Sequence, residues 1–287
     1  MRAKILDGNV LAKMIKDQLK DEVGKLRQKY GKVPTLVNII VGYDSGSCVY
    51  ASSQKKTTEN IGIGYRLELL PKDISQESVI EGIEILNNDS NVHGIMINRP
   101  VPSHIGYGVI ANHVDYRKDI EGINVANIGM VMLGEANFLP CTPAAVMEHI
   151  RSTGVLLRGK EVVVVGHSRS VGKPLALLLL KQLATVTVCN IGTSEAGNLK
   201  DHVSRAEILI VAVGKPGLIK GDWIKPGAIV IDVGINNLEG RIVGDVEFEE
   251  ATERASYITP VPGGVGPVTV AMLMRNTVEA FKTQMQK

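Results

Sequence analysis

A short run of β-branched residues followed at once by a glycine turn is the sequence feature that most constrains the fold of this chain. Residues 161–165 have the sequence Glu-Val-Val-Val-Val, which predicts a buried strand, and an apolar helix is expected after the turn at residues 166–174. At such a turn, backbone NH groups and the helix dipole can bind a pyrophosphate. Ser168 and Val171 occupy two positions of a GxGxxG motif, so the turn taken alone fits an ordinary strand-to-helix loop equally well.

The remaining sequence continues to alternate between predicted strands and helices. Strands are expected at residues 36–41, 65–70, 94–98, 185–189, 208–213 and 228–233, with helices between them. This alternation favours parallel sheets with helical crossovers, so we predict an α/β protein of two domains. We expect residues 1–140 and the last helix, within residues 269–287, to form an N-terminal α/β domain with a parallel sheet. Residues 141–268 are expected to form a Rossmann domain.

The charge and cysteine patterns exclude several classes of function. The 287 residues include 32 Lys and Arg and 30 Asp and Glu, with no like-charged block, so neither nucleic acid nor a membrane surface is an expected partner. Three scattered cysteines without a CxxC pair, and six histidines without metal-binding spacing, make a disulfide framework and a metal site unexpected. Residues 1–23 lack the apolar core of a signal peptide, and no apolar run is long enough to span a membrane. We therefore expect a cytoplasmic protein that acts on a small molecule.

A predicted helix near residue 50 carries a phenol and an amide on one face. Ser47 is a residue type that caps helices, and the segment after it is expected to be helical up to Gly62. Tyr50 and Gln54 are then one turn apart on this helix. We therefore expect the two side chains to share a pocket.

Loops rich in glycine and proline follow several of the predicted strands. Residues 214–217 (Gly-Lys-Pro-Gly) and 232–236 (Asp-Val-Gly-Ile-Asn) are expected beside the Gly166 turn, at the carboxyl edge of one sheet. Residues 259–267 (Thr-Pro-Val-Pro-Gly-Gly-Val-Gly-Pro) form the most specific motif, with three prolines and three glycines. A rigid loop that is nearly free of side chains lets backbone groups approach a flat ligand closely. Shorter motifs are Val41-Gly42, Lys118-Asp119-Ile120-Glu121-Gly122, Pro140-Cys141-Thr142-Pro143 and Gly244-Asp245-Val246.

In this order, the motifs resemble those of the bifunctional methylenetetrahydrofolate dehydrogenase/cyclohydrolase family over nearly the whole chain. The resemblance implies a two-domain homodimer whose folate pocket is expected in the cleft between the N-terminal α/β domain and the Rossmann domain. It also implies oxidation of the methylene bridge of 5,10-methylenetetrahydrofolate by hydride transfer to a nicotinamide cofactor. Most members then hydrolyse the methenyl product to 10-formyltetrahydrofolate.

The resemblance places the candidate catalytic residues at Tyr50, Gln54, Asn98 and Glu121. In most members a lysine stands at the position of Gln54, a glutamine at that of Asn98, and an aspartate that holds the pterin at that of Glu121. An amide cannot exchange protons in the useful pH range, so we expect Gln54 to leave cyclohydrolase activity weak or absent. Hydride transfer makes fewer chemical demands on side chains than hydrolysis does, because the cofactor carries out the redox chemistry. We therefore expect dehydrogenase activity to remain.

The same resemblance gives a wider set of candidate substrate-binding residues. These are Tyr50, Gln54, Ile97, Asn98, Arg99, Glu121, Pro262, Gly263, Gly264 and Val265. Arg99 replaces a usual leucine, and its pKa above 12 prevents it from acting as a base. The alternative interpretation is that these changes are neutral drift within an unchanged active site.

The residues expected to bind the cofactor favour NAD over NADP. They are Thr142, Gly166, His167, Ser168, Ile191, Gly214 and Ile235. NADP-dependent relatives carry an arginine at the position of His167 and a serine or arginine after the strand at residues 185–189. A mostly neutral imidazole and the alkyl side chain of Ile191 offer little to a phosphate dianion. Arg169 and Lys173 lie nearby, and NADP therefore remains the alternative.

Three functions are compatible with these residues. The leading prediction is an NAD-linked methylenetetrahydrofolate dehydrogenase with little cyclohydrolase activity. The second is a bifunctional, NADP-dependent enzyme that makes 10-formyltetrahydrofolate. The third is a catalytically silent subunit that binds folate or a dinucleotide and regulates a partner, although an inactive site has no need of both the proline-glycine loop and the dinucleotide turn.

Overall fold

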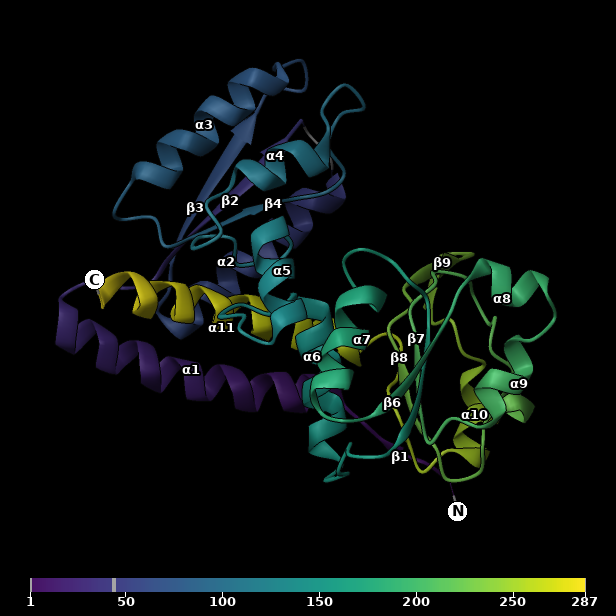
Figure 1. Cartoon of the computed structure of the whole chain (residues 1–287). Helices are drawn as coiled ribbons and strands as arrows, with labels where there is room; N and C mark the ends of the chain where they lie inside the picture. The colour runs from purple at the N-terminus through teal and green to yellow at the C-terminus, as the bar shows by residue number, and fades with distance from the viewer. Residues whose placement is uncertain (1, 43–44, 287) are drawn as a thin grey trace. The chain divides into compact units, whose positions relative to one another are not determined.

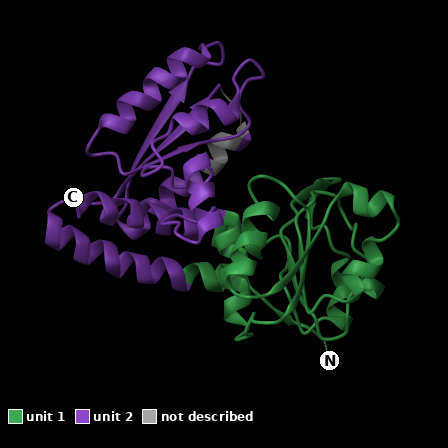
Figure 2. Ribbon diagram, viewed as in Figure 1, with its two compact units in different colours: residues 1–13, 142–269 green, residues 14–141, 270–287 purple. Residues whose placement is uncertain are grey.

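The computed structural model describes residues 2–42 and 45–286, without the side chains of residues 45 and 47–50. The chain divides into two compact units, which Figure 2 shows in different colours. Unit 1 contains residues 1–13 and 142–269, and unit 2 contains residues 14–141 and 270–287. The predicted two-domain α/β architecture, with a parallel sheet in each part and a Rossmann-type second sheet, is confirmed.

Unit 1 is built on a six-stranded parallel sheet with the order β1-β11-β8-β7-β5-β6. Its strands are β1 (Lys4–Ile5), β5 (Glu161–Val165), β6 (Thr185–Cys189), β7 (Ile208–Val211), β8 (Ile229–Asp232) and β11 (Tyr257–Ile258). Its helices are α6 (Cys141–Ser152), α7 (Gly172–Lys181), α8 (Ile191–Glu195), α9 (Leu199–Ser204), α10 (Phe248–Arg254) and the 3₁₀ turn η1 (Gly221–Trp223). Strands β9 (Asn236–Leu238) and β10 (Arg241–Val243) form a separate antiparallel hairpin.

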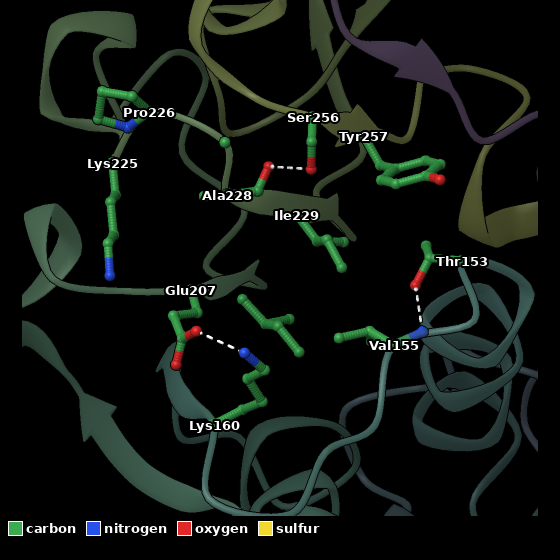
Figure 3. A pocket seen from close by; sticks show the side chains of 12 residues that line it. Thr153, Val155, Lys160, Glu207, Lys225, Pro226, Ala228, Ile229, Ser256 and Tyr257 are labelled. Carbon is green, nitrogen blue, oxygen red and sulfur yellow. Dashed lines mark hydrogen bonds and ion pairs between the residues drawn. The ribbon is translucent and has the colours of Figure 1, made fainter.

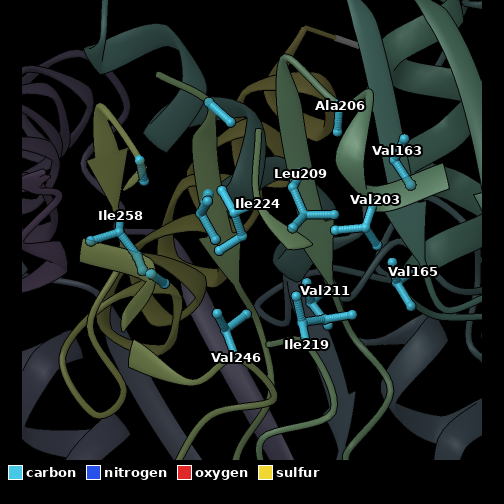
Figure 4. Close-up of a cluster of buried hydrophobic side chains, with 14 of the residues drawn as sticks. Val163, Val165, Val203, Ala206, Leu209, Val211, Ile219, Ile224, Val246 and Ile258 are labelled. Carbon is cyan, nitrogen blue, oxygen red and sulfur yellow. The ribbon is translucent and has the colours of Figure 1, made fainter. Parts of the chain in front are cut away.

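The sheet of unit 1 is covered by helices on both faces. Figure 1 shows α6 and α7 on one face and α9 and α10 on the other. Strands buried on both faces need apolar side chains at every position, which explains the continuous valine run of β5. Figure 4 shows the core on one face, where Val163, Leu209 and Ile258 are fully buried. Burial of each such side chain contributes about 1.5 to 3 kcal/mol to folding.

Unit 2 contains a three-stranded parallel sheet with the order β3-β2-β4. Its strands are β2 (Thr35–Val41), β3 (Gly64–Leu70) and β4 (Gly94–Ile97). Its helices are α2 (Ser45–Ile61), α3 (Gln76–Asn88), α4 (Tyr107–His113) and α5 (Val125–Leu133), with most of α1 (Gly8–Tyr30) and α11 (Val265–Met285). Val37, Ile39 and Val41 pack against α3 and α4, so the residues that alternate with them face the other side of the sheet.

Two details differ from the sequence-based expectations. The helix near residue 50 begins at Ser45, so Ser47 lies inside α2 and the prediction that it caps the helix is wrong. The expected division placed residues 1–13 with the first domain, and the structure places them with the Rossmann sheet of unit 1. Here Lys4 N donates to Ser256 O at 2.8 Å, because β1 pairs with β11. A two-residue strand is too short to produce a detectable sequence pattern.

The last helix returns to unit 2, as the sequence analysis expected. Asn276 of α11 donates its side-chain amide to the carbonyl oxygens of Ile120 and Leu139, at 2.8 and 2.9 Å. Over the residues that the structure describes, no helix has the length and apolar character needed to cross a membrane.

Candidate functional site

Three side-chain amides of unit 2 form a buried chain of hydrogen bonds. Asn98 Nδ2 donates to Asn38 Oδ1 at 2.6 Å, and Asn38 Nδ2 donates to Gln54 Oε1 at 2.7 Å. Asn38 Nδ2 also donates to the Tyr65 hydroxyl at 2.9 Å. Gln54 is 0% exposed, and among the described residues its Nε2 has no hydrogen-bond partner. The candidate residues Gln54 and Asn98 are therefore connected through a residue that the sequence analysis did not select.

That residue, Asn38, lies in the middle of β2. It is 0% exposed and belongs to the face of the strand opposite to Val37 and Ile39. The sequence did contain a signal for Asn38, since it is an amide inside the apolar run of residues 36–41. A polar group in a buried strand requires a hydrogen-bond partner. Tyr65 was also missed. Burial raises the pKa of its hydroxyl, and the hydrogen bond from Asn38 opposes this shift.

The expected pairing of Tyr50 with Gln54 falls partly outside the described residues. Both positions belong to α2, but the side chain of Tyr50 is not described. The shared pocket of these two side chains therefore stays a prediction.

Glu121 is partly buried at the end of the Lys118–Gly122 motif. Its Oε2 accepts a hydrogen bond from the backbone NH of Ile97 at 3.2 Å. Burial raises the pKa of Glu121 to about 7, the charge of Asp119 adds to this rise, and the NH of Ile97 and the guanidinium of Arg99 oppose it. Near neutral pH this carboxyl can therefore both donate and accept hydrogen bonds.

Asp119 has a structural role beside Glu121. Its carboxylate accepts hydrogen bonds from the backbone NH groups of Gly122 and Asn124 at 3.1 and 2.8 Å, and from Asn127 Nδ2 at 2.8 Å. These bonds fix the turn that carries Glu121. Asp119 and Glu121 therefore differ in role. The carboxylate of Asp119 is occupied by backbone NH groups of the turn, and that of Glu121 is not.

Arg99 and Tyr107 lie next to Glu121. The Arg99 guanidinium carbon is 5.1 Å from the centroid of the Tyr107 ring, a cation–π contact. Burial raises the pKa of the Tyr107 hydroxyl, and the charge of Glu121 raises it further. Tyr107 at the start of α4 is another residue that the sequence analysis missed, since nothing in its local sequence distinguishes it from a surface tyrosine.

A cavity of about 340 Å³ lies at the carboxyl edge of the sheet in unit 1. Its lining includes Gly166, His167 and Ser168 after β5, Asn190 and Ile191 after β6, and Val213 and Lys215 after β7. The strand register explains this convergence, because Val165 pairs with both Cys189 and Val211. The structure thus brings together four of the seven candidate cofactor-binding residues, Gly166, His167, Ser168 and Ile191.

The glycine turn is shaped by close backbone contacts. Gly166 has a φ of +122°, and a Cβ at this position would lie 2.3 Å from the carbonyl oxygen of Ala212. A Cβ on Gly172 would lie 2.0 Å from the carbonyl oxygen of Gly166. These two glycines, rather than a GxGxxG motif, let β5 lead into α7 through a tight strand-to-helix turn, the kind of turn at which a phosphate can bind. The cavity and the turn together fit a dinucleotide.

Two buried carboxylates hold the loops around this cavity. Asp245 accepts four hydrogen bonds, from the backbone NH groups of residues 213–215 and from Asn236 Nδ2, at 2.8 to 2.9 Å. Asp232 accepts backbone hydrogen bonds from Gly234 and from residues 245–246, and burial raises its pKa to about 6. Gly214 is positioned by this network. The Gly244-Asp245-Val246 motif was the sequence signal, but its partners could not be inferred from it.

The proline-glycine loop lines a second cavity of unit 1, with a volume of about 490 Å³. Pro262, Gly263, Gly264 and Val265 share this lining with Ile235, which is 67% exposed. The backbone NH of Gly8 donates to the carbonyl oxygen of Gly263 at 2.8 Å and so holds the loop against the start of α1. Thr142 lies in the first turn of α6 and lines neither of these two cavities.

A third cavity of unit 1, of about 310 Å³, lies at the amino ends of β5, β7 and β8. Figure 3 shows that several of its polar groups bind one another. Lys160 Nζ is 2.7 Å from Glu207 Oε1, and Ser256 Oγ donates to the carbonyl oxygen of Ala228 at 3.3 Å. We therefore assign no ligand to it. Among the described residues, no group of three or more His, Cys, Asp or Glu is arranged to hold a metal ion.

Comparison with known proteins adds an independent finding. Residues 6–121 match the sequence model of the tetrahydrofolate dehydrogenase/cyclohydrolase catalytic domain, and residues 140–285 match that of the NAD(P)-binding domain of the same family. The bifunctional protein FolD of Acetivibrio thermocellus is 51% identical over 285 residues, which cover 99% of each chain.

Solved structures of such proteins also resemble this one. The bifunctional FolD methylenetetrahydrofolate dehydrogenase/cyclohydrolase of Campylobacter jejuni has a TM-score of 0.95 and 43% identity, covering 98% of this chain and 99% of that chain. The Trypanosoma brucei methylenetetrahydrofolate dehydrogenase-cyclohydrolase, complexed with NADP and an inhibitor, has a TM-score of 0.94 and 38% identity over 100% of both chains.

Proposed function

Because the chain belongs to the tetrahydrofolate dehydrogenase/cyclohydrolase family, we propose that it oxidises 5,10-methylenetetrahydrofolate to 5,10-methenyltetrahydrofolate, with NAD as the acceptor and with little or no cyclohydrolase activity. The general activity, that of a methylenetetrahydrofolate dehydrogenase/cyclohydrolase, follows from the family. The cofactor preference and the loss of hydrolysis are the parts proposed here.

The observation that carries the proposal is that Gln54 is buried and hydrogen-bonded at the position expected for the catalytic base. Its side chain is fully buried and its Oε1 accepts a hydrogen bond from Asn38. Hydrolysis of the methenyl cation requires a group that takes a proton from water, and an amide does not do this. Lys55 is 60% exposed in its side chain and lies near Glu59, so it does not replace the missing base at this position.

Oxidation of the methylene bridge needs no such base. The bridging carbon transfers a hydride to the cofactor, and the folate becomes the methenyl cation. No proton has to be moved in this step. A bound nicotinamide supplies the hydride acceptor. The residues of this chain have to bind and align the substrate, and we propose that Glu121 pairs with the amino and ring NH groups of the pterin while the backbone of residues 262–265 contacts a flat ring.

The proposed NAD preference depends on the cavity beside the Gly166 turn. His167 is exposed, and Ile191 is 68% exposed directly after β6. The side chain of Asn190 caps α8 through Thr193 N at 3.3 Å. None of these three side chains offers a fixed positive charge to a 2′-phosphate.

A second candidate function is the bifunctional, NADP-dependent enzyme. One observation favours it, because Lys215 lines the same cavity and carries a charge that a phosphate could bind. The Trypanosoma brucei relative was also solved with NADP. Under this alternative, NADP is the better cofactor and the methenyl product is consumed.

One assay separates these functions. The purified protein is mixed with methylenetetrahydrofolate and either NAD or NADP, and the absorbances of the reduced nicotinamide and of methenyltetrahydrofolate are followed. We expect a higher kcat/KM with NAD and a methenyl product that decays only at the rate of a buffer blank. Faster hydrolysis of added methenyltetrahydrofolate, or a preference for NADP, would support the bifunctional alternative. No turnover with either cofactor would support the silent regulatory subunit.

A further inference from the structure

The direction of the amide chain in unit 2 determines which atom of Gln54 is left for a ligand. The Oδ1 of Asn38 accepts from Asn98, so the amide NH₂ of Asn38 faces both Gln54 and Tyr65. Each of these two partners must then offer an oxygen to Asn38. Gln54 does so with Oε1, which leaves its Nε2 on the other side of the amide group.

Rotation of the Gln54 amide by half a turn is disfavoured by these surroundings. It would place Nε2 against Asn38 Nδ2, so that two donors face each other and the 2.7 Å hydrogen bond is lost. Asn38 and Gln54 are both 0% exposed, so water cannot compensate for that loss. Asn38 in this orientation therefore fixes the orientation of Gln54.

The Nε2 of Gln54 is a buried donor without a partner among the described residues. Buried polar groups almost always have a partner, and an exception calls for a ligand or another explanation. Because Nε2 can only donate, the partner must be an acceptor atom. A folate carries such atoms in its ring carbonyl, its ring nitrogens and its benzoyl carbonyl. Since Gln54 is closed to solvent, side chains around it must shift when such an atom binds.

We propose that Asn38 is a positioning residue that sets Gln54 as a hydrogen-bond donor to an acceptor atom of the folate substrate, an inference that rests on the proposed function. Asn38 acts through Gln54 and does not itself touch the substrate. The pocket thereby selects ligands with an acceptor at this point and disfavours those with a donor.

The variant Asn38→Asp reverses the direction of the chain. When ionised, the new carboxylate has no donor, so it accepts hydrogen bonds from Asn98, Tyr65 and the Nε2 of Gln54, and Gln54 then presents Oε1 to the substrate. Because residue 38 is buried and burial raises the pKa of a carboxyl, the kinetics of this variant are measured at alkaline pH. We expect the KM for methylenetetrahydrofolate to rise about tenfold, the effect of losing one hydrogen bond, with kcat and the KM for the dinucleotide changed less than twofold. The increase should shrink at low pH, because a protonated carboxyl can donate to Oε1 as the Asn38 amide does.

A double-mutant cycle separates positioning from a purely structural effect. In a Gln54→Met background there is no amide to orient, so Asn38→Asp should then change the KM for folate less than twofold. An equal effect in both backgrounds, or no effect in the wild-type background, would overturn the proposal. Thermal unfolding of each variant shows which of them are folded and can be compared.

Neutron diffraction of deuterium-exchanged crystals of the unmodified protein tests the same inference without any turnover. Deuterons on Asn38 Nδ2 that point at Gln54 Oε1 support it. Deuterons on Gln54 Nε2 that point at Asn38 Oδ1 would refute it. A protein that does not oxidise methylenetetrahydrofolate would contradict the proposed function and still leave this measurement decisive for Asn38.

Discussion

The two units hold their candidate binding groups by different kinds of contact. In unit 1, the carboxylates of Asp232 and Asp245 accept hydrogen bonds from backbone NH groups of the loops around the cavity beside the Gly166 turn. In unit 2, Gln54 and Asn98 are joined through the side-chain amide of Asn38. A carboxylate bound to backbone NH groups fixes a loop whatever side chains the loop carries, whereas an amide chain depends on the orientation of every member. Side-chain changes should therefore be tolerated in the loops of unit 1 and be strongly coupled in unit 2.

The largest expected effect concerns the backbone network of unit 1. Asp245→Ala removes the acceptor of four hydrogen bonds at a position that is 0% exposed. We expect the free energy of unfolding to fall by about 3 to 5 kcal/mol, since buried donors lose their partner. Urea unfolding measures this change, and Asp245→Asn, which keeps one acceptor oxygen, is the matched control with a smaller loss. A decrease below about 1 kcal/mol for the alanine variant would show that this network is not what holds the loops.

In unit 2, the next largest effect is expected at Glu121. Glu121→Ala would leave polar groups of a bound pterin without a partner and cost about 2 to 4 kcal/mol of transition-state binding. Steady-state kinetics with methylenetetrahydrofolate should show this as a loss in kcat/KM, while the KM for the dinucleotide stays unchanged. Glu121→Asp keeps the carboxylate and is the control. An unchanged kcat/KM in the alanine variant would mean that the pterin is held by other residues.

The raised pKa of Glu121 also predicts how stability depends on pH. The pKa is about 7 in the folded chain against 4.5 for an ordinary glutamate, so between these values the folded state binds more protons than the unfolded state. The contribution of Glu121 to the free energy of unfolding is fully present below about pH 4.5. It is lost as the pH rises through 7, and the free energy of unfolding falls by up to about 1.4 kcal/mol per pH unit. The stability of the wild type relative to Glu121→Gln, measured by urea unfolding at pH 5, 6 and 7, should therefore fall as the pH rises. His93, whose pKa burial lowers to about 4, changes stability in the opposite direction in both proteins and cancels in this difference. Parallel curves for the two proteins would place the titration elsewhere, with Asp232 of unit 1 the next candidate because its pKa is also raised.

The smallest expected effect tests the tolerance of the loops in unit 1. Ile191→Arg adds a cation at a position that is 68% exposed and follows β6. We expect kcat/KM with NADP to improve about two- to fivefold, as for an exposed ion pair, with little change in stability or in the kcat/KM with NAD. Ile191→Gln, which is neutral, is the control. A loss of stability above about 1 kcal/mol would contradict the view that this loop is held by its backbone.

The grouping of the candidate cofactor-binding residues in unit 1 could largely be predicted from the sequence, and less of the grouping of the candidate folate-binding residues in unit 2. Gly166, His167, Ser168 and Ile191 line one cavity, because parallel strands place the residues that follow them at one edge of the sheet. Asn38, Tyr65 and Tyr107 were not found. Their importance comes from contacts with distant residues, and the hydrogen bonds of Asn38 connect positions 16, 27 and 60 residues away.

The sequence by itself determined the order of strands and helices, the parallel sheets and the position of the glycine turn. These features follow from local patterns, since a strand buried on both faces needs apolar residues throughout and a tight turn needs glycine. Only the tertiary structure decided that β1 joins β11, that Asp245 ties three loop residues together, and that Asn38 stands between Gln54 and Asn98. The reason is that a hydrogen bond between side chains depends on sheet register and strand order, which bring together residues that no local pattern relates.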